Sequence, residues 1–223
     1  MPVLQSNLLP TVFKRLDLET RIVVLDMGPA ASSTVSFFNH FKCRLSFVDI
    51  YSEQFITCPD SDLSQDELVA QMTKSLSLDV NVKIDICLFW DLFNYLNDAM
   101  IKALIEALEP HINHSTSGYV IGTRDSRNQL PFCRYGIVDK NNLTENNASG
   151  TQGTIYPRSQ RDLNRLIDYF EIDSGRLLSE GRAEYLLFEN RDSDKSDKSI
   201  ISVSYTHLRA HETVLDLVCR LLL

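Results

Sequence analysis

The sequence predicts an α/β fold with a mostly parallel central sheet, helices on both faces and an antiparallel strand pair near its carboxyl end. Two apolar runs, residues 22–25 and 83–90, suit strands that are covered on both faces. Amphipathic helical segments alternate with strands, which is the order of a parallel βαβ sheet. Two further strand patterns, 171–178 and 182–189, flank a turn at 179–181.

The first elements form a helix and a βαβ unit. Residues 2–18 have apolar side chains at helical spacing, interrupted by Pro10, so we expect a helix that packs on the sheet or covers a site. The unit then consists of a strand, a loop, a helix and a second strand, at residues 22–25, 26–33, 34–41 and 44–50. Ser32 or Ser33 is expected to cap its helix.

The loop of this unit is suited to a ligand. Gly28 can adopt a backbone conformation that residues with a Cβ resist, and Ala30 keeps side-chain bulk away. Free N–H groups at the start of the helix favour an electron-rich ligand. Asp49 ends the second strand with a carboxylate, where such folds receive the sugar hydroxyls of a nucleoside. The unit therefore predicts a site for a nucleoside-containing ligand.

This pattern resembles the class I S-adenosylmethionine-dependent methyltransferases. Their first motif is a strand ending in an acid and a glycine-rich turn, D-x-G-x-G-x-G, and a second acid ends the next strand. Asp26, Gly28 and Asp49 match, whereas Ala30 and Ser32 replace the later glycines. The resemblance implies a Rossmann-like methyltransferase fold, S-adenosylmethionine as cofactor, and cofactor contacts from Asp26, Gly28, Ala30 and Asp49. A dinucleotide enzyme fits less well because G-x-G-x-x-G is absent.

The end of the second apolar run provides further candidates. In the family, the corresponding strand delivers residues to the space between cofactor and substrate, which implies Trp90, Asp91 and Asn94. Trp90 would contact the cofactor and Asp91 would be the catalytic proton acceptor. Ordinary packing of Trp90, and a cap or loop hydrogen bond for Asp91, are the alternatives. The segment lacks the N-P-P-Y of amino-methylating nucleic-acid enzymes, which argues against a nucleobase substrate.

The remaining elements follow from caps and periodicity. Residues 51–63 are expected to be irregular, with a short apolar piece where the family has its third strand. Helices are predicted after the capping box Ser64-x-x-Glu67, after Asn97 or Asp98, and after Ser159. A short strand is predicted at residues 118–123.

Residues 124–156 are rich in Asn, Gly, Ser, Thr and Arg, and we expect an irregular loop. Arg124, Arg127, Arg134 and Tyr135 lie in it. They can bind an acidic substrate, or they can belong to a solvated loop.

Composition limits the function classes. The chain has 223 residues, 43% of them hydrophobic, which is enough for one domain. A net charge of −8 disfavours a nucleic-acid partner. There is neither a secretory signal nor an apolar run of about 18 residues, so we expect a cytoplasmic protein without a membrane partner. The five cysteines show no C-x-x-C spacing, so reduced thiols and no metal site are expected.

The carboxyl-terminal segment differs from the rest. A methyltransferase-like domain is expected over residues 1–190, followed by a disordered polar linker at 191–201. Residues 202–223 resemble the translation of a sequencing adapter, codon by codon over 203–213 and again over 217–223. We therefore expect a non-native tail and do not interpret its His and Cys residues as metal ligands.

Together these features predict an S-adenosylmethionine-dependent methyltransferase that acts on a small molecule or a protein side chain. A non-catalytic methyltransferase-like binding or interaction module is the alternative, and the lost glycines favour it. Another nucleoside-binding α/β protein is a third possibility.

Overall fold

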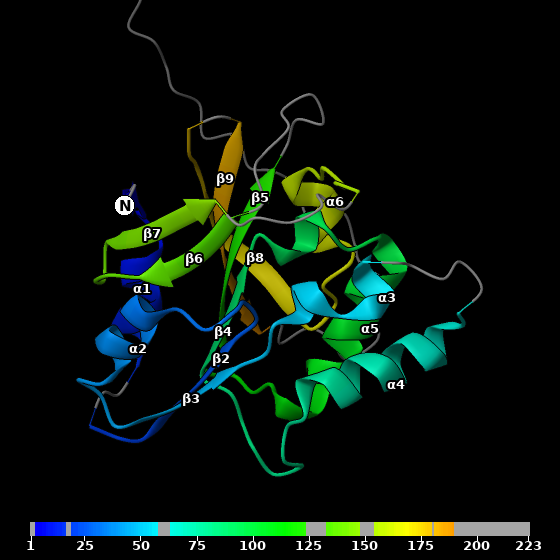
Figure 1. Cartoon of the computed structure of the whole chain (residues 1–223), viewed down its shortest axis with the longest axis horizontal. Helices are drawn as coiled ribbons and strands as arrows, with labels where there is room; N and C mark the ends of the chain where they lie inside the picture. The colour runs from blue at the N-terminus through cyan, green and yellow to red at the C-terminus, as the bar shows by residue number, and fades with distance from the viewer. Residues whose placement is uncertain are drawn as a thin grey trace, which may run out of the picture. The chain divides into compact units, whose positions relative to one another are not determined.

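A six-stranded sheet forms the centre of the computed structural model, which describes residues 3–16, 19–57, 63–123, 133–147, 154–179 and 181–189 (Figure 1). Its strand order is β3-β2-β4-β5-β9-β8. The strands are β2 (Ile22–Asp26), β3 (Cys43–Phe47), β4 (Ile86–Trp90), β5 (Ser117–Thr123), β8 (Phe170–Leu177) and β9 (Arg182–Glu189). The first four strands in this order are parallel, and β9 pairs antiparallel with both β5 and β8. The predicted fold class is confirmed.

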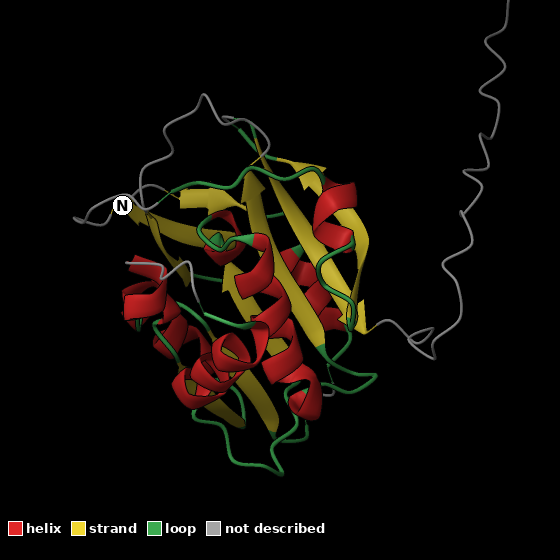
Figure 2. Cartoon of the chain, turned by 90° about the vertical axis from the view of Figure 1, so that its right-hand side faces the viewer, coloured by secondary structure: helices red, strands yellow, loops and turns green. Residues whose placement is uncertain are grey.

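Helices cover both faces of this sheet, as Figures 1 and 2 show. One face carries α1 (Leu9–Lys14) and α2 (Ser32–Phe38), and the other carries α4 (Gln65–Leu76) and α5 (Asp98–Leu108). Shorter helical pieces lie in the connections: η1 (Ile50–Ser52), α3 (Gln54–Thr57), η2 (Leu92–Asn94), η3 (Glu109–His111) and α6 (Gln160–Asn164).

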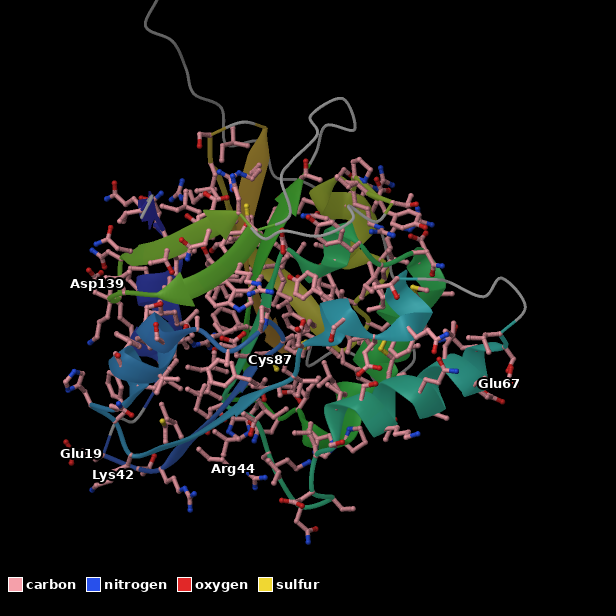
Figure 3. All side chains as sticks on the ribbon, viewed as in Figure 1. Glu19, Lys42, Arg44, Glu67, Cys87 and Asp139 are labelled. Atoms are coloured by element: carbon pink, nitrogen blue, oxygen red, sulfur yellow. The ribbon has the colours of Figure 1, made fainter. Side chains whose placement is uncertain are left out.

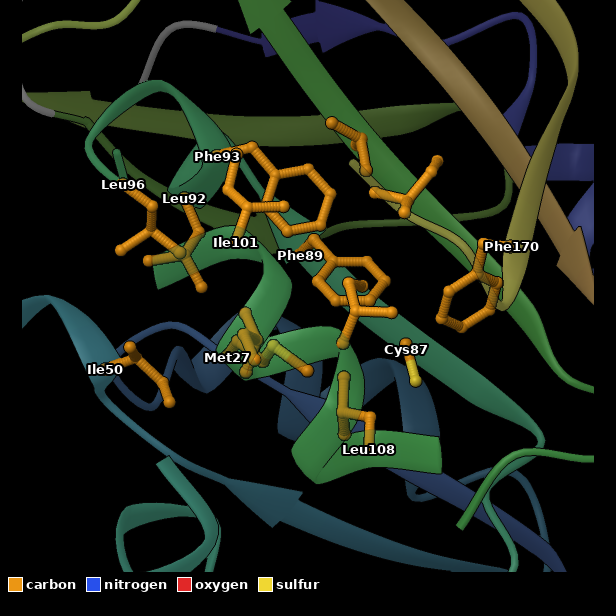
Figure 4. Packing of buried hydrophobic residues seen from close by; sticks show 14 of the residues in the cluster. Met27, Ile50, Cys87, Phe89, Leu92, Phe93, Leu96, Ile101, Leu108 and Phe170 are labelled. Carbon is orange, nitrogen blue, oxygen red and sulfur yellow. The ribbon is translucent and has the colours of Figure 1, made fainter. Parts of the chain in front are cut away.

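The strands are buried on both sides because their side chains alternate between two cores. Cys87 and Phe89 of β4 point into the core on the α4 and α5 side (Figure 4). Leu88 and Trp90 of the same strand point into the core formed with α1 and α2. This explains why β4 reads as a continuous apolar run in the sequence.

A second, antiparallel sheet lies over the face of α1 and α2. It consists of β1 (Val3–Gln5), β7 (Asn142–Asn147) and β6 (Cys133–Ile137), in that order. The prediction of an irregular loop over residues 124–156 is therefore wrong for its central part. Cys133, Tyr135 and Ile137 alternate inward and are buried, and Asp139 accepts the N–H groups of the turn that joins the two strands (Figure 3).

Two boundaries in the βαβ unit also differ from the prediction. The N-cap of α2 is Ala31, which provides no side-chain bond, and Ser33 instead lies 3.4 Å from Thr144 of β7. The second strand ends at Phe47, so Asp49 lies beyond it, at the start of η1. Helical pieces η1 and α3 occupy the described part of the segment where a third strand was considered.

Several local predictions are confirmed. The Ser64 hydroxyl accepts the N–H of Glu67 while the Glu67 carboxylate accepts the N–H of Ser64, which completes the capping box (Figure 3). The expected helix over residues 2–18 is wrong for its first part, because Val3–Gln5 form β1, and Pro10 does not interrupt a helix but lies in the first turn of α1, where a missing N–H costs little. The predicted linker and tail, together with Arg124 and Arg127, lie outside the described residues. Among the described helices, none combines the length and apolar character needed to span a membrane.

Buried charged groups connect the two sheets. Arg182 of β9 forms an ion pair with Glu145 of β7, and both side chains are largely buried. Glu184 of β9 is fully buried and accepts hydrogen bonds from the Ser6 hydroxyl, the Asn7 N–H and the Tyr119 hydroxyl. The smaller sheet and the amino-terminal segment are thus both bound to β9.

We expect Glu145→Gln to destabilise the protein by about 3 kcal/mol, because it leaves the buried Arg182 charge without its counter-ion. Urea unfolding followed by circular dichroism measures this change. Replacing both partners with apolar residues, Glu145→Leu with Arg182→Met, should restore much of the stability because no charge is then buried.

The exposed pair Arg44–Asp79 provides a matched control (Figure 3). Asp79→Asn removes the same kind of partner from a solvated arginine and should cost less than about 1 kcal/mol. Equal losses in Glu145→Gln and Asp79→Asn would show that the buried pair does not hold the sheets together.

Candidate functional site

The strand order locates the candidate site. From β2 the chain passes to β3 on one side and then returns to β4 on the other side, so the order reverses between β2 and β4. In open α/β sheets, ligands bind in the crevice outside the carboxyl ends of the strands at such a reversal. Here those ends are Asp26 and Trp90. The fold thus brings together two of the predicted site residues.

Asp26 is a buried carboxylate with one bonded oxygen. Its Oδ1 accepts hydrogen bonds from Trp90 Nε1, at 2.6 Å, and from the Gly28 N–H, at 3.0 Å. Its Oδ2 is also buried and has no hydrogen-bond partner among the described residues. Burial raises the pKa of Asp26 to about 7, although the two hydrogen bonds oppose this change. The group can therefore gain or lose a proton near neutral pH.

Trp90 is packed into this crevice, with 1% of its surface exposed. Its ring stacks on Tyr135 of β6, with centroids 5.6 Å apart and an angle of 15° between the planes. Tyr119 approaches at a steep angle from β5, at 6.0 Å. The backbone φ of Trp90 is +51°, at a register shift between β4 and β5. This left-handed conformation is unfavourable for a bulky residue and costs about 1–3 kcal/mol.

A glycine is required at position 28 because there is little room for a side chain, and not because the backbone conformation is unusual. The only glycine with positive φ in the described part of the chain is Gly181, so Gly28 does not use its conformational freedom. A Cβ on Gly28 would lie 3.2 Å from Trp90 Cδ1 and 3.3 Å from Asp26 Oδ1. The indole therefore occupies the space beside Gly28 that the sequence analysis assigned to a ligand.

Asp49 and Ala30 lie at the exposed border of this region. The carboxyl ends of β2 and β3 are adjacent, since the Val48 N–H donates to the Asp26 carbonyl oxygen at 2.8 Å. The Asp49 side chain is exposed and has no hydrogen-bond or ion-pair partner within the described residues. Asp49 is thus free to accept hydrogen bonds from a ligand.

A cavity of about 460 Å³ separates the loop from the smaller sheet. Its lining consists of Pro29, Ala30, Ala31, Ser32 and Ser33 on one side, and Arg134, Tyr135, Thr144, Asn146 and Asn147 on the other. Arg134 is exposed and has no partner among the described residues. A cavity of this size is in the range of small-molecule sites, and its hydroxyl, amide and guanidinium groups suit a polar ligand.

Asp91 and Asn94 form hydrogen bonds in the protein interior. Asp91 is buried, and its Oδ1 accepts the Tyr51 hydroxyl at 2.6 Å. Burial raises the pKa of Asp91 to about 7 against the lowering effect of this bond. Asn94 joins η2 to β5, because its amide donates to the Ile121 carbonyl oxygen and accepts the Thr123 N–H.

The sequence did not indicate the contacts that Tyr51 and Tyr135 make in the site. Tyr51 covers Asp91, and Tyr135 covers Trp90. The alternation of Cys133, Tyr135 and Ile137 before the turn at Asp139 was the signal for β6 and hence for Tyr135. For Tyr51 the local sequence has no signal, because its partner is 40 residues away.

Comparisons with known proteins show distant similarity of structure. Neither a protein-family model nor a curated protein sequence matches the chain. Among solved structures, a S-adenosylmethionine-dependent methyltransferase from Clostridium acetobutylicum is 12% identical, with a TM-score of 0.47 over 80% of this chain and 87% of that one. Mitomycin 7-O-methyltransferase MmcR is 10% identical, with a TM-score of 0.47 over 82% of this chain and 53% of that one. The pyocyanin biosynthetic protein PhzM is 12% identical, with a TM-score of 0.43 over 82% and 54%.

This chain thus spans about half the length of MmcR and of PhzM. At such identities and TM-scores, the similarity does not define what this chain binds. The class that its own strand order and helix layers define is a Rossmann-like α/β protein whose strand order reverses between β2 and β4.

The raised pKa of Asp26 predicts a pH dependence of stability. Between its ordinary value of 3.8 and about 7, the folded chain retains a proton that the unfolded chain has lost. Stability from this group is therefore fully present below about pH 4 and is lost as the pH rises toward 7. Asp91 acts in the same direction.

Asp26→Asn keeps an oxygen that can accept both hydrogen bonds but removes the titration. Between pH 5 and 7, the free energy of unfolding should fall less steeply with pH in this variant than in the wild type. The two slopes should differ by at most about 1.4 kcal/mol per pH unit. Urea titrations at several pH values measure the two slopes. Parallel slopes would mean that Asp26 is ionised throughout this range.

Proposed function

We propose that this chain binds S-adenosylmethionine at the crevice between β2 and β4 and transfers its methyl group to a small molecule. The supporting observation is a pair of carboxylates, Asp26 at the end of β2 and Asp49 shortly after β3. These strands are parallel neighbours, and the small-residue loop after β2 borders a cavity of about 460 Å³. Such an arrangement offers hydrogen-bond acceptors to both ends of a nucleoside that carries an amino acid.

The residues present fit this ligand in two respects. The exposed Asp49 carboxylate can accept the two ribose hydroxyls. The unpaired, buried Oδ2 of Asp26 can accept a hydrogen bond from the ammonium group at the amino-acid end. The third requirement is free space beside Gly28, and here the Trp90 indole must be displaced.

When bound, S-adenosylmethionine supplies an electrophilic methyl group on a positively charged sulfur. The chain itself contributes position, because an acceptor held in the neighbouring cavity is aligned for in-line attack. The acceptor would lose a proton as it took up the methyl group. Asp91 is the proposed proton acceptor, and its raised pKa suits this role near neutral pH. Because the Tyr51 hydroxyl donates to Asp91 Oδ1 and neither residue lines the cavity, this role requires that the acceptor's proton reach Asp91 through Tyr51.

The cavity favours a small, polar and acidic acceptor over a protein side chain. Arg134 provides an unpaired positive charge at its border, in a chain whose net charge is −8. Serine, threonine and asparagine side chains also line the cavity, beside proline, alanine and tyrosine. A carboxylate or phosphate on the acceptor would form a charge-assisted hydrogen bond with Arg134.

A non-catalytic binding module is the second candidate, and one observation favours it. Asp91 is buried, and its Oδ1 is bonded to Tyr51, so it faces no described cavity. In such a module the same crevice would bind the nucleoside without transferring its methyl group.

Asp49→Ala should weaken binding of S-adenosylhomocysteine by about tenfold or more, because each charge-assisted hydrogen bond contributes about 1.5–3 kcal/mol. Isothermal titration calorimetry measures the affinity without knowledge of the acceptor. Asp66→Ala removes an exposed carboxylate from the first turn of α4 and should leave the affinity unchanged. If the wild-type protein gives no heat at millimolar ligand, the proposed cofactor is wrong.

Arg134→Ala should raise the KM for acidic acceptors by about tenfold with little change in kcat, because the lost ion pair positions the substrate and does not enter the chemical step. A panel of small hydroxy acids and amino acids, each beside its neutral amide, can be screened by release of S-adenosylhomocysteine. Arg176→Ala, an exposed arginine on β8, is the matched control. Preference for the neutral amides would contradict an acidic acceptor.

A further inference from the structure

Trp90 occupies the place that the proposed ligand requires. The indole Nε1 donates to Asp26 Oδ1 at 2.6 Å, and the ring lies so close to Gly28 that an added Cβ would contact Cδ1 at 3.2 Å. The carboxylate that would receive the ligand's ammonium group is thus already bonded to a donor from the protein itself. The indole thus fills the space between Asp26 and Gly28 at the carboxyl ends of β2 and β4.

Neighbouring residues hold the Trp90 ring in place, whereas the backbone of Trp90 is strained. Tyr135 of β6 stacks on its ring, and the hairpin of β6 and β7 is attached to the main sheet through Glu145 and Arg182. The backbone at Trp90 is in the left-handed region, at the register shift where β4 ends. Strained backbone of this kind is common in elements that switch between two conformations.

We propose that Trp90 is the gate residue of the donor site, and that the structure is its closed state. In the open state the indole leaves Asp26 and the space beside Gly28, and the nucleoside ligand takes its place. This inference rests on the proposed function. It implies that the apparent affinity for the ligand is reduced by the small fraction of open molecules.

The gate can be observed directly because Trp90 is the chain's single tryptophan. We expect S-adenosylhomocysteine, added to the full chain, to shift the tryptophan emission to longer wavelength and to increase its quenching by acrylamide. Both changes should saturate at the same ligand concentration as the heat measured by calorimetry.

Two variants separate the hydrogen bond from the volume of the ring. Trp90→Phe keeps an aromatic ring against Tyr135 but removes the donor to Asp26, and it should bind S-adenosylhomocysteine about tenfold more tightly than the wild type. Trp90→Ala removes the obstruction itself and should also bind more tightly, provided that circular dichroism shows it to be folded. Phe89→Leu is the control, because Phe89 is adjacent in β4 but faces the opposite core.

The outcomes distinguish the gate from the proposed function. Binding by the Trp90 variants that is tighter than that of the wild type, with no such gain in Phe89→Leu, supports the gate. Wild-type binding with unchanged tryptophan emission, and equal affinity in Trp90→Phe, would overturn the gate and leave the proposed function intact. If neither the wild type nor the folded Trp90 variants bind at millimolar ligand, the proposed function fails and the gate with it.

Discussion

The hydrogen bond from Trp90 to Asp26 is the interaction on which the architecture of the site depends. It joins the carboxyl ends of β2 and β4, the two strands between which the chain reverses direction across the sheet. A buried carboxylate is costly unless it is bonded or protonated, and here only one of its oxygens has a partner among the described residues. Asp26 therefore retains a raised pKa and an unused acceptor, while Trp90 is held in a position that its own backbone disfavours. The unused acceptor of Asp26 and the strained backbone of Trp90 both lie at the place where a Rossmann-like fold binds its ligand.

The smaller sheet completes this arrangement from outside the parallel core. Its strand β6 supplies Tyr135, which covers the indole, and β7 supplies Glu145, which pairs with Arg182 of the main sheet. The same hairpin forms one wall of the cavity beside the small-residue loop. A segment that has the composition of a solvated loop is thus the element that shapes the candidate acceptor pocket and covers the donor site. Its buried ion pair and its alternating inward side chains explain how a polar sequence holds a fixed position.

The effect of replacing the later glycines differs between the expectation from the sequence and the structure. Ala30 and Ser32 border an open cavity, so loss of the glycines has not closed the loop. The obstruction comes from Trp90, on a strand that follows about 60 residues later in the chain. The difference between an enzyme and a binding module therefore depends less on the loop than on the mobility of one aromatic side chain and on the access of an acceptor to the buried Asp91.

The sequence by itself determined the elements whose causes are local. Continuous apolar runs predicted β2 and β4, the capping box predicted the start of α4, and the turn at 179–181 predicted the pair β8 and β9. In each case the deciding interactions lie within a few residues, or follow from burial of a whole strand. Only the tertiary structure decided that Asn142–Thr144 of β7 pair with β1, that Ser33 faces Thr144 instead of capping its helix, and that Trp90 bonds to Asp26. These contacts join residues roughly 60 to 140 positions apart, and their geometry exists only after the sheets have packed together. Local propensity cannot encode such distances, so the sequence could nominate the residues of the site but not show which of them face one another.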